Sequence, residues 1–360
     1  MPTMKDVARL AGVSQPTVSH VINGTASISD AVVKRVHEAI ERLGYVPNAA
    51  AKSLKTSKTR IIGVLVPDVG IRYYSEMVKS LEVLLRDKGY MVFLCNTFYS
   101  TALERAYVQT LIQHNVLGVI AGFDLADQGS VALLREHRIP AVTLDSGCAD
   151  GTEYRVRVDN EKLARIAVSH LYDTGARCIS YCSEPMGVEV LQARYVFFQK
   201  ALQELGLEFE EKRCFIAHNP HGVYDKMERG YQAGANLLLH EEIDAVFASS
   251  DEFAFGIISR LKEHGVAIPQ RMPILGCDND PFSVLMDPPL TTVWQPIARM
   301  AETGVNMLLK LTDGDTVAEK DVCLEPELII RESTLKMRAQ SNATVSVGPS
   351  GYFDKEELKS

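Results

Sequence analysis

The chain of 360 residues is predicted to combine a small all-α head with a parallel α/β body. In the head, short amphipathic helical stretches share one small apolar face. From Ile61 onward, short continuous apolar runs alternate with longer amphipathic stretches, a pattern typical of parallel strands covered by helices on both faces. The body is long for one open sheet, so we expect it to form two lobes.

The start of the chain has the pattern of a helix-turn-helix unit, which places a helix in the DNA major groove. Val7, Leu10 and Ala11 give the first helix an apolar face. Gly12 suits the turn because it has no Cβ, and Ser14 is well placed to cap the second helix. The alternative is a set of helices that only pack together.

A third helix, from Ser29 to Gly44, would complete the head. Charge favours DNA binding over simple packing. Residues 1–60 contain nine Lys or Arg and four Asp or Glu, a net charge of +5, whereas the whole chain carries −8. A basic head on an acidic body is expected where only the head meets phosphate.

The order of these patterns predicts the domain boundaries. Residues 47–60 form a linker with helical potential that is too short to be a stable helix alone. The predicted segments are 1–46 (head), 47–60 (hinge helix or linker), 61–335 (two-lobed core) and 336–360 (flexible tail). Within the core, the expected lobes are 61–159 with 292–323, and 160–291 with 324–335.

Acidic residues follow several of the predicted strands. Ligands of open α/β folds bind at the carboxyl ends of strands, so two facing lobes would enclose a cleft for a small polar molecule there. The alternative is that these acids are helix N-caps. The residues are Asp68, Asp124, Asp145, Asp251 and Asp278.

Several classes of protein lack support in this sequence. It has no secretory signal and no apolar run long enough to span a bilayer, so we expect no membrane association. Its seven cysteines are odd in number and lack metal spacing, which fits a reducing cytoplasm. We find no phosphate-binding loop, catalytic Ser elbow or zinc motif, and we expect no cofactor and no metal.

Some segments are specific enough to indicate a family. They are Asp6-Val-Ala-Arg-Leu-Ala-Gly-Val-Ser14, Thr17-Val-Ser-His-Val-Ile-Asn23, Leu43-Gly-Tyr-Val-Pro-Asn48 and Ile62-Gly-Val-Leu-Val-Pro-Asp68. With them, the chain from about Thr3 to Thr334 resembles the LacI/GalR family of bacterial transcription regulators. The resemblance implies a helix-turn-helix head, a hinge helix and a core like the periplasmic sugar-binding proteins. It also implies a homodimer on near-palindromic, double-stranded operator DNA.

The resemblance also assigns roles within the head. Gln15, Pro16 and His20 match its base-reading positions. Leu54 matches a hinge leucine that wedges into a minor-groove step, at a cost of a few kcal/mol of unstacking. The positions that match phosphate contacts, which fix register rather than sequence, are Thr3, Ser14, Thr17, Ser19 and Asn23.

In the core, the resemblance implies an effector cleft. Carboxylates facing an arginine suit a polyol or sugar, because each hydroxyl needs a donor and an acceptor. The expected effector is a sugar, sugar acid, sugar phosphate or purine. Arg72 is unusual for the family and either selects an acidic ligand or lies on the surface. The matching residues are Tyr73, Tyr74, Asp159, Asn160, Arg194, Asp251 and Asp278.

The sequence therefore predicts a DNA-binding transcription regulator, a repressor rather than an enzyme, whose operator binding a small polar metabolite controls. One alternative is a sugar receptor that does not bind DNA, but the basic head argues against it. Another is a sugar-acting α/β enzyme, for which no nucleophile and base are arranged in the sequence.

Overall fold

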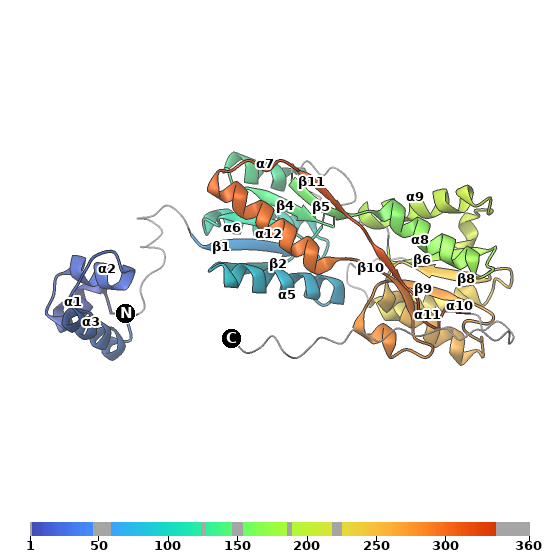
Figure 1. Cartoon of the computed structure of the whole chain (residues 1–360), viewed down its shortest axis with the longest axis horizontal. Helices are drawn as coiled ribbons and strands as arrows, with labels where there is room; N and C mark the ends of the chain where they lie inside the picture. Colours follow the sequence, from blue (N-terminus) through green and yellow to red (C-terminus); the bar gives the residue numbers. More distant parts are fainter. Residues whose placement is uncertain are drawn as a thin grey trace. The chain divides into compact units, whose positions relative to one another are not determined.

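The computed structural model describes residues 2–45, 59–123, 125, 127–145, 154–185, 189–217 and 225–335. The chain divides into two compact units, Met1–Thr59 and Arg60–Ser360, which we describe separately as the head and the core (Figure 1). Leu54 and Asp124 lie outside the described residues, as does the predicted tail. Among the described helices, none is both long and apolar enough to cross a bilayer.

The head contains α1 (Met4–Ala11), α2 (Gln15–Asn23) and α3 (Asp30–Leu43). Gly12, which follows α1, adopts a left-handed conformation (φ 65°) that only glycine takes up without strain. One expectation is wrong in detail: Leu10 is 42% exposed, and Ala8 packs inward instead. The buried residues of the head are Val7, Ala8, Ala11, Val18, Val36, Ala39 and Tyr45.

The first lobe is built on a six-stranded sheet in the order β11-β5-β4-β3-β1-β2. All the strand pairs in it are parallel, and a helix lies between each two strands that follow one another in the chain from β1 to β4. Figure 1 shows α5 and α12 together on one face, with α6 and α7 on the other. The strands are β1 (Ile61–Val66), β2 (Met91–Asn96), β3 (Gly118–Ala121), β4 (Ala141–Leu144), β5 (Tyr154–Val158) and β11 (Asp321–Leu324). The helices are α5 (Arg72–Asp87), α6 (Thr101–Gln113), α7 (Gln128–Glu136) and α12 (Ile297–Asp313).

The second lobe has its own six-stranded sheet, in the order β12-β10-β9-β8-β6-β7, in which only the β12 pairing is antiparallel. Its strands are β6 (Ile179–Ser183), β7 (Phe215–Ile216), β8 (Ala245–Ala248), β9 (Ile274–Asp278), β10 (Thr291–Trp294) and β12 (Glu327–Ile329). Its helices are α8 (Asn160–Asp173), α9 (Glu189–Glu204), α10 (Lys226–Leu237) and α11 (Asp251–Glu263), with short 3-10 turns η1 (Glu211–Arg213) and η2 (Pro281–Val284).

Close packing of α10 on α11 depends on glycine. A Cβ added to Gly256 would lie 2.0 Å from the backbone oxygen of Met227, and one added to Gly230 would lie 2.0 Å from the backbone oxygen of Phe253. No side chain fits at those distances. The two helices therefore touch through their backbones, which fixes the start of α10 beside the end of β8.

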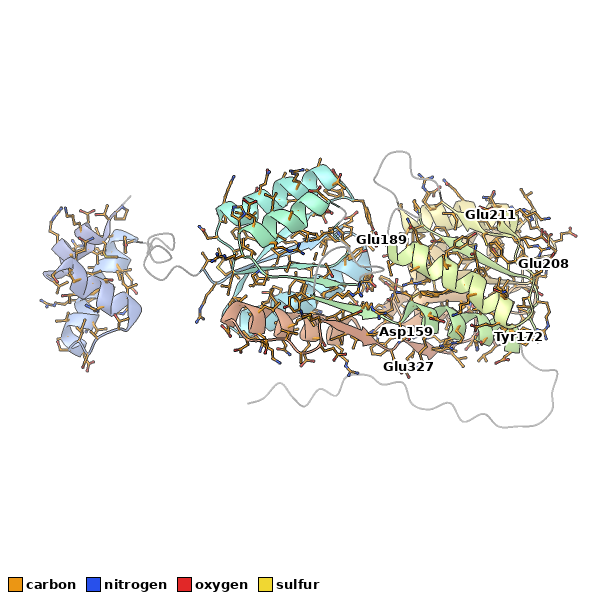
Figure 2. All side chains as sticks on the ribbon, turned by 90° about the horizontal axis from the view of Figure 1, so that it is seen from above. Asp159, Tyr172, Glu189, Glu208, Glu211 and Glu327 are labelled. Carbon is orange, nitrogen blue, oxygen red and sulfur yellow. The ribbon has the colours of Figure 1, made fainter. Side chains whose placement is uncertain are left out.

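The chain passes between the lobes after β5, after β10 and after β11. Figure 2 shows Asp159 where the lobes meet, between β5 and α8. The second passage lies later in the chain than the predicted lobe boundary between residues 291 and 292. Thr292 and Trp294 still pair with β9 and β12 in the second sheet, so the chain leaves this lobe only after Trp294. The prolines at 288 and 289 precede β10.

Candidate functional site

The head presents a polar surface on α2. Gln15, Pro16 and His20 are all exposed, as base-reading residues must be. The His20 ring is fixed by a 2.9 Å hydrogen bond between Nδ1 and Thr25 Oγ1. Its other nitrogen, Nε2, is thus the atom that can reach a base edge.

Several of the predicted phosphate-contacting side chains also shape the head. Ser14 Oγ accepts a hydrogen bond from the Thr17 backbone N–H (3.3 Å) and lies 2.8 Å from Thr17 Oγ1, so this pair caps α2. Thr3 donates to the Asp6 carboxylate from its backbone N–H (2.9 Å) and from Oγ1 (2.6 Å). Ser19 is half-buried on α2, and Asn23 is the last residue of that helix.

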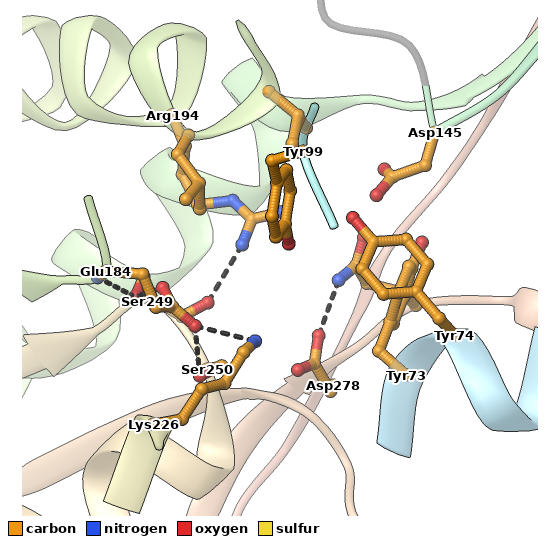
Figure 3. A pocket seen from close by; sticks show the side chains of 13 residues that line it. Tyr73, Tyr74, Tyr99, Asp145, Glu184, Arg194, Lys226, Ser249, Ser250 and Asp278 are labelled. Carbon is orange, nitrogen blue, oxygen red and sulfur yellow. Dashed lines mark hydrogen bonds and ion pairs between the residues drawn. The ribbon is translucent and has the colours of Figure 1, made fainter. Parts of the chain in front are cut away.

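In the core, a cleft of about 420 Å³, counting the part open to solvent, lies between the two lobes (Figure 3). Both lobes and the strand ends supply its wall. Five of its polar residues directly follow or end a strand, as expected for a ligand site of an α/β fold; they are Asp145, Glu184, Ser249, Asp278 and Gln295. The lining residues are Tyr73, Tyr74, Tyr99, Asp145, Glu184, Val190, Leu191, Arg194, Lys226, Ser249, Ser250, Asp278 and Gln295.

Arg194 is the best-anchored cation of this cleft. It comes from α9 and is 3% exposed. Asn160 Oδ1 accepts from its Nε (3.2 Å) and Nη2 (3.1 Å), and the Ser249 backbone oxygen accepts from Nη1 (2.9 Å). These partners are neutral, and among the described residues no carboxylate lies within ion-pair distance of the guanidinium. Arg194 therefore keeps its full positive charge and a fixed orientation.

Glu184 and Lys226 form an ion pair in the wall of the cleft. Lys226 Nζ lies 2.7 Å from Glu184 Oε1, and the hydroxyls of Ser249 and Ser250 also donate to this carboxylate. The Glu184 side chain is 1% exposed and that of Lys226 is 13% exposed. Burial alone would raise the pKa of Glu184, but the Lys226 charge and the two hydroxyls lower it to about 2.

Three buried polar atoms in the wall have no hydrogen-bond partner among the described residues. They are Tyr73 Oη, Asp145 Oδ1 and Gln295 Oε1. Tyr73 Oη lies close enough to Asp145 to affect its pKa, but the pair lacks hydrogen-bond geometry. Because unpaired buried polar atoms are costly, they mark where the groups of a polar ligand would bind.

Two acids of the cleft have unusual backbone and electrostatic environments. Asp145 and Asp278 have positive φ angles of 55° and 111°, which side-chain-bearing residues rarely adopt and which cluster at binding sites. Burial raises the pKa of both carboxyls above the ordinary value, well above it for Asp278. Asp278 Oδ1 accepts a 2.7 Å hydrogen bond from Gln295 Nε2.

Of the predicted effector residues, four line the cleft: Tyr73, Tyr74, Arg194 and Asp278. Asn160 lies behind the wall, where it orients Arg194 and is 6% exposed. The expectation for Asp159 is wrong, because its carboxylate accepts from the Lys162 backbone N–H (2.8 Å) and caps α8.

The expectation for Asp251 is also wrong. This residue is fully buried and does not line the cleft. Its carboxylate accepts 2.7 Å hydrogen bonds from the Asp280 backbone N–H, Ser283 Oγ and Thr292 Oγ1. With three protein donors bound, it fixes the loop after β9 to β10 and has no accessible face for a ligand.

The strand-end rule selected Asp145, but sequence reasoning missed several other polar residues of the wall as ligand contacts. Glu184 directly follows β6, so the same rule could have selected it. Lys226 stands at the first position of α10, where a cation opposes the helix dipole. This unfavourable position of a lysine could have indicated a functional role for Lys226. In contrast, no feature of the sequence around Tyr99 predicts that this residue lines the cleft.

The head and the cleft together define a class of protein, in which a DNA-reading head is joined to a two-lobed core for a small polar ligand. Residues 3–48 match the family described as "Bacterial regulatory proteins, lacI family", and residues 168–334 match "Periplasmic binding protein-like domain". Both matches agree with the division into head and core.

Individual proteins extend this similarity to nearly the full length. The HTH-type transcriptional repressor PurR of Actinobacillus pleuropneumoniae serotype 5b (strain L20) is 34% identical over 336 residues, which cover 92% of this chain and 98% of PurR. The lac repressor dimer bound to operator and the anti-inducer ONPF has a TM-score of 0.81 at 25% identity, covering 93% of this chain and 99% of its own. The transcriptional regulator CelR in complex with cellobiose has a TM-score of 0.68 at 27% identity, covering 92% and 100%.

The chain belongs to the lacI family of bacterial regulatory proteins. It is a DNA-binding transcriptional repressor under allosteric control, not an enzyme. The fold class predicted from the sequence, an all-α head and a two-lobed parallel α/β core, is confirmed.

Proposed function

We propose that the head reads a near-palindromic operator through Gln15, Pro16 and His20. Their exposure on α2 and the fixed His20 ring support this assignment. Gln15 can pair with adenine or donate to guanine, and His20 can address a guanine edge. Leu54 is proposed as the minor-groove wedge of the hinge. Because the protein acts on DNA, we place it in the bacterial cytoplasm.

The proposed effector is a neutral polyhydroxylated molecule, such as a sugar, bound in the cleft. The observation that carries this proposal is the set of unpaired buried atoms on Tyr73, Asp145 and Gln295, which lines the same cleft as the Arg194 guanidinium. Hydroxyl groups both donate and accept hydrogen bonds, so they suit a wall that offers both donors and acceptors. CelR, a relative in the same family of folds, was solved with cellobiose.

Charge favours a neutral ligand over a phosphorylated one. The wall holds two cations and three acids, and Glu184 already neutralises Lys226. A phosphate would add negative charge beside Asp145 and Asp278. A purine is the second candidate, because the rings of Tyr73, Tyr74 and Tyr99 line the same cleft.

The active form is proposed to be a homodimer, which would place two heads on two operator half-sites. Exposed apolar side chains support a self-association surface on the core. Met91 (64%) and Leu94 (43%) lie on β2, an edge strand of the first sheet, and Leu285 (74%) follows η2. The lac repressor was solved as a dimer bound to operator.

Thermal unfolding of the full chain in the presence of neutral sugars, sugar acids, sugar phosphates and purine bases tests the effector assignment. A neutral sugar should raise the melting temperature, because it binds only the native state. Arg194→Gln should abolish that shift, while the matched control Arg299→Gln, an exposed arginine of α12, should retain it. A shift produced only by phosphorylated sugars, or one unchanged in Arg194→Gln, would refute this assignment.

A further inference from the structure

Beside the cleft, two segments from opposite lobes contact each other. One is the first turn of α5, which carries Arg72 and Tyr73; the other is the end of β9 with the loop that follows it, which carry Asp278 and Asp280. Tyr73 and Asp278 line the effector cleft. Their neighbours form a direct contact between the lobes, in which Arg72 Nε lies 3.2 Å from Asp280 Oδ2.

Asp280 is held rigidly on its own lobe. Its side chain is 4% exposed, and its Oδ1 accepts a 2.7 Å hydrogen bond from the Phe282 backbone N–H. Its own backbone N–H donates to Asp251 Oδ2 at 2.7 Å, and Asp251 in turn binds Thr292 of β10. The carboxylate facing Arg72 is therefore fixed to the sheet, and a movement of the loop is a movement of the lobe.

Arg72 makes further contacts with the second lobe. Its guanidinium lies 5.4 Å from the centre of the Phe282 ring, in cation–π geometry, while Glu76 on its own helix lies 3.3 Å from Nη2. The Glu252 carboxylate of α11 approaches the Arg72 backbone N–H, at a helix start whose N-cap, Ile71, has no capping side chain. Negative charge from one lobe thus complements the positive start of a helix of the other.

We propose that Arg72 and Asp280 form a cross-lobe latch, an ion pair that holds the lobes closed beside the cleft and thereby sets how readily effector enters and leaves. In this proposal Arg72 binds the opposite lobe, and it neither selects an acidic ligand nor serves only as a surface residue.

Opening of the lobes would break the latch, because it would separate Arg72 from Asp280. The same movement would separate Tyr73 from Asp278. An ion pair present in only one of two conformations shifts the balance between them by its own interaction free energy. The Arg72 side chain is 39% exposed, so the contribution is modest and sensitive to salt. Its effect on effector binding rests on the proposed function, but lobe closure itself does not.

Hydrogen exchange measured by mass spectrometry on the ligand-free full chain tests the latch. Arg72→Gln and Asp280→Asn should each speed exchange of the amides in residues 279–285 and in the first turn of α5 by about two- to fivefold. Asn keeps the oxygen that accepts from Phe282, so Asp280→Asn removes the charge without removing that hydrogen bond. The double variant should exchange no faster than either single one, because both remove the same interaction.

Arg86→Gln is the matched control, since Arg86 pairs with Glu82 within α5 on a single lobe. It should leave exchange in residues 279–285 unchanged. Unaltered exchange in Arg72→Gln, or additive effects of the two single variants, would overturn the latch. The experiment uses neither effector nor DNA, so its outcome is independent of whether the proposed effector and operator are correct.

Discussion

Replacing Glu184 by Gln is expected to reveal how strongly the cleft depends on its buried ion pair. The substitution keeps the size and an acceptor oxygen but removes the negative charge that lies 2.7 Å from the Lys226 ammonium. The pKa of Glu184 is about 2 in the folded protein against an ordinary value of 4.5, a difference worth about 3 kcal/mol at neutral pH. Breaking a buried ion pair by removing one partner costs a similar amount, about 3–5 kcal/mol.

Because the folded-state pKa is lowered, this stabilisation is fully present above pH 4.5 and is lost as the pH falls toward 2. Thermal and urea unfolding at pH 7 should show Glu184→Gln destabilised by about 3 kcal/mol, or roughly 6–10 °C in melting temperature. The difference from wild type should shrink by about 2 kcal/mol at about pH 3.

Two further variants make this test specific. Glu184→Gln combined with Lys226→Met should be more stable than Glu184→Gln alone, because the double variant no longer buries the cation of a broken ion pair. Glu82→Gln, which breaks the exposed pair with Arg86, should change stability by less than about 1 kcal/mol. Equal stability of Glu184→Gln and wild type at pH 7, or a difference that does not depend on pH, would refute the reasoning.

Other predictions concern the anchor of the β9 loop and the hinge. Burial raises the pKa of Asp251 to about 7, despite three hydrogen bonds that lower it. Because this pKa lies above the ordinary value of 3.8, the unfolded state releases the proton first, and the stability of wild type relative to Asp251→Asn should fall as the pH rises from about 4 to about 7 and level off above that in urea unfolding; a constant difference would show that Asp251 does not titrate in this range. Leu54→Ala should weaken binding to the operator by about tenfold or more while leaving binding to random DNA nearly unchanged. Equal losses in a gel-shift titration would argue against a minor-groove wedge.

The fold and the head could be predicted from the sequence because their determinants are local. Gly12 and Ser14 set the turn and the helix cap through their own backbone and hydroxyl, with partners only three or four residues away. Buried strands such as β1 are apolar throughout because both faces are covered by helices. Such patterns need no knowledge of the far end of the chain.

What the sequence left undecided was the partner of each acid. Asp159, Asp251 and Asp278 all lie at a strand end or at the start of a helix, so their local sequence is equivalent. In the folded core, Asp159 caps a helix, Asp251 binds a loop and only Asp278 faces the cleft. The difference arises from donors 29 to 41 residues away for Asp251, which only tertiary packing brings within reach.

Arg72 and Lys226 show the same division. Their charge and their place at the start of a helix are written in the sequence, but their partners, Asp280 and Glu184, come from distant segments. The sequence alone determined the class of fold, the DNA-reading head and the edge of each sheet where a ligand would bind. Tertiary structure alone decided which charges pair with each other and which remain for a ligand, because electrostatic interactions depend on distance in space and not along the chain.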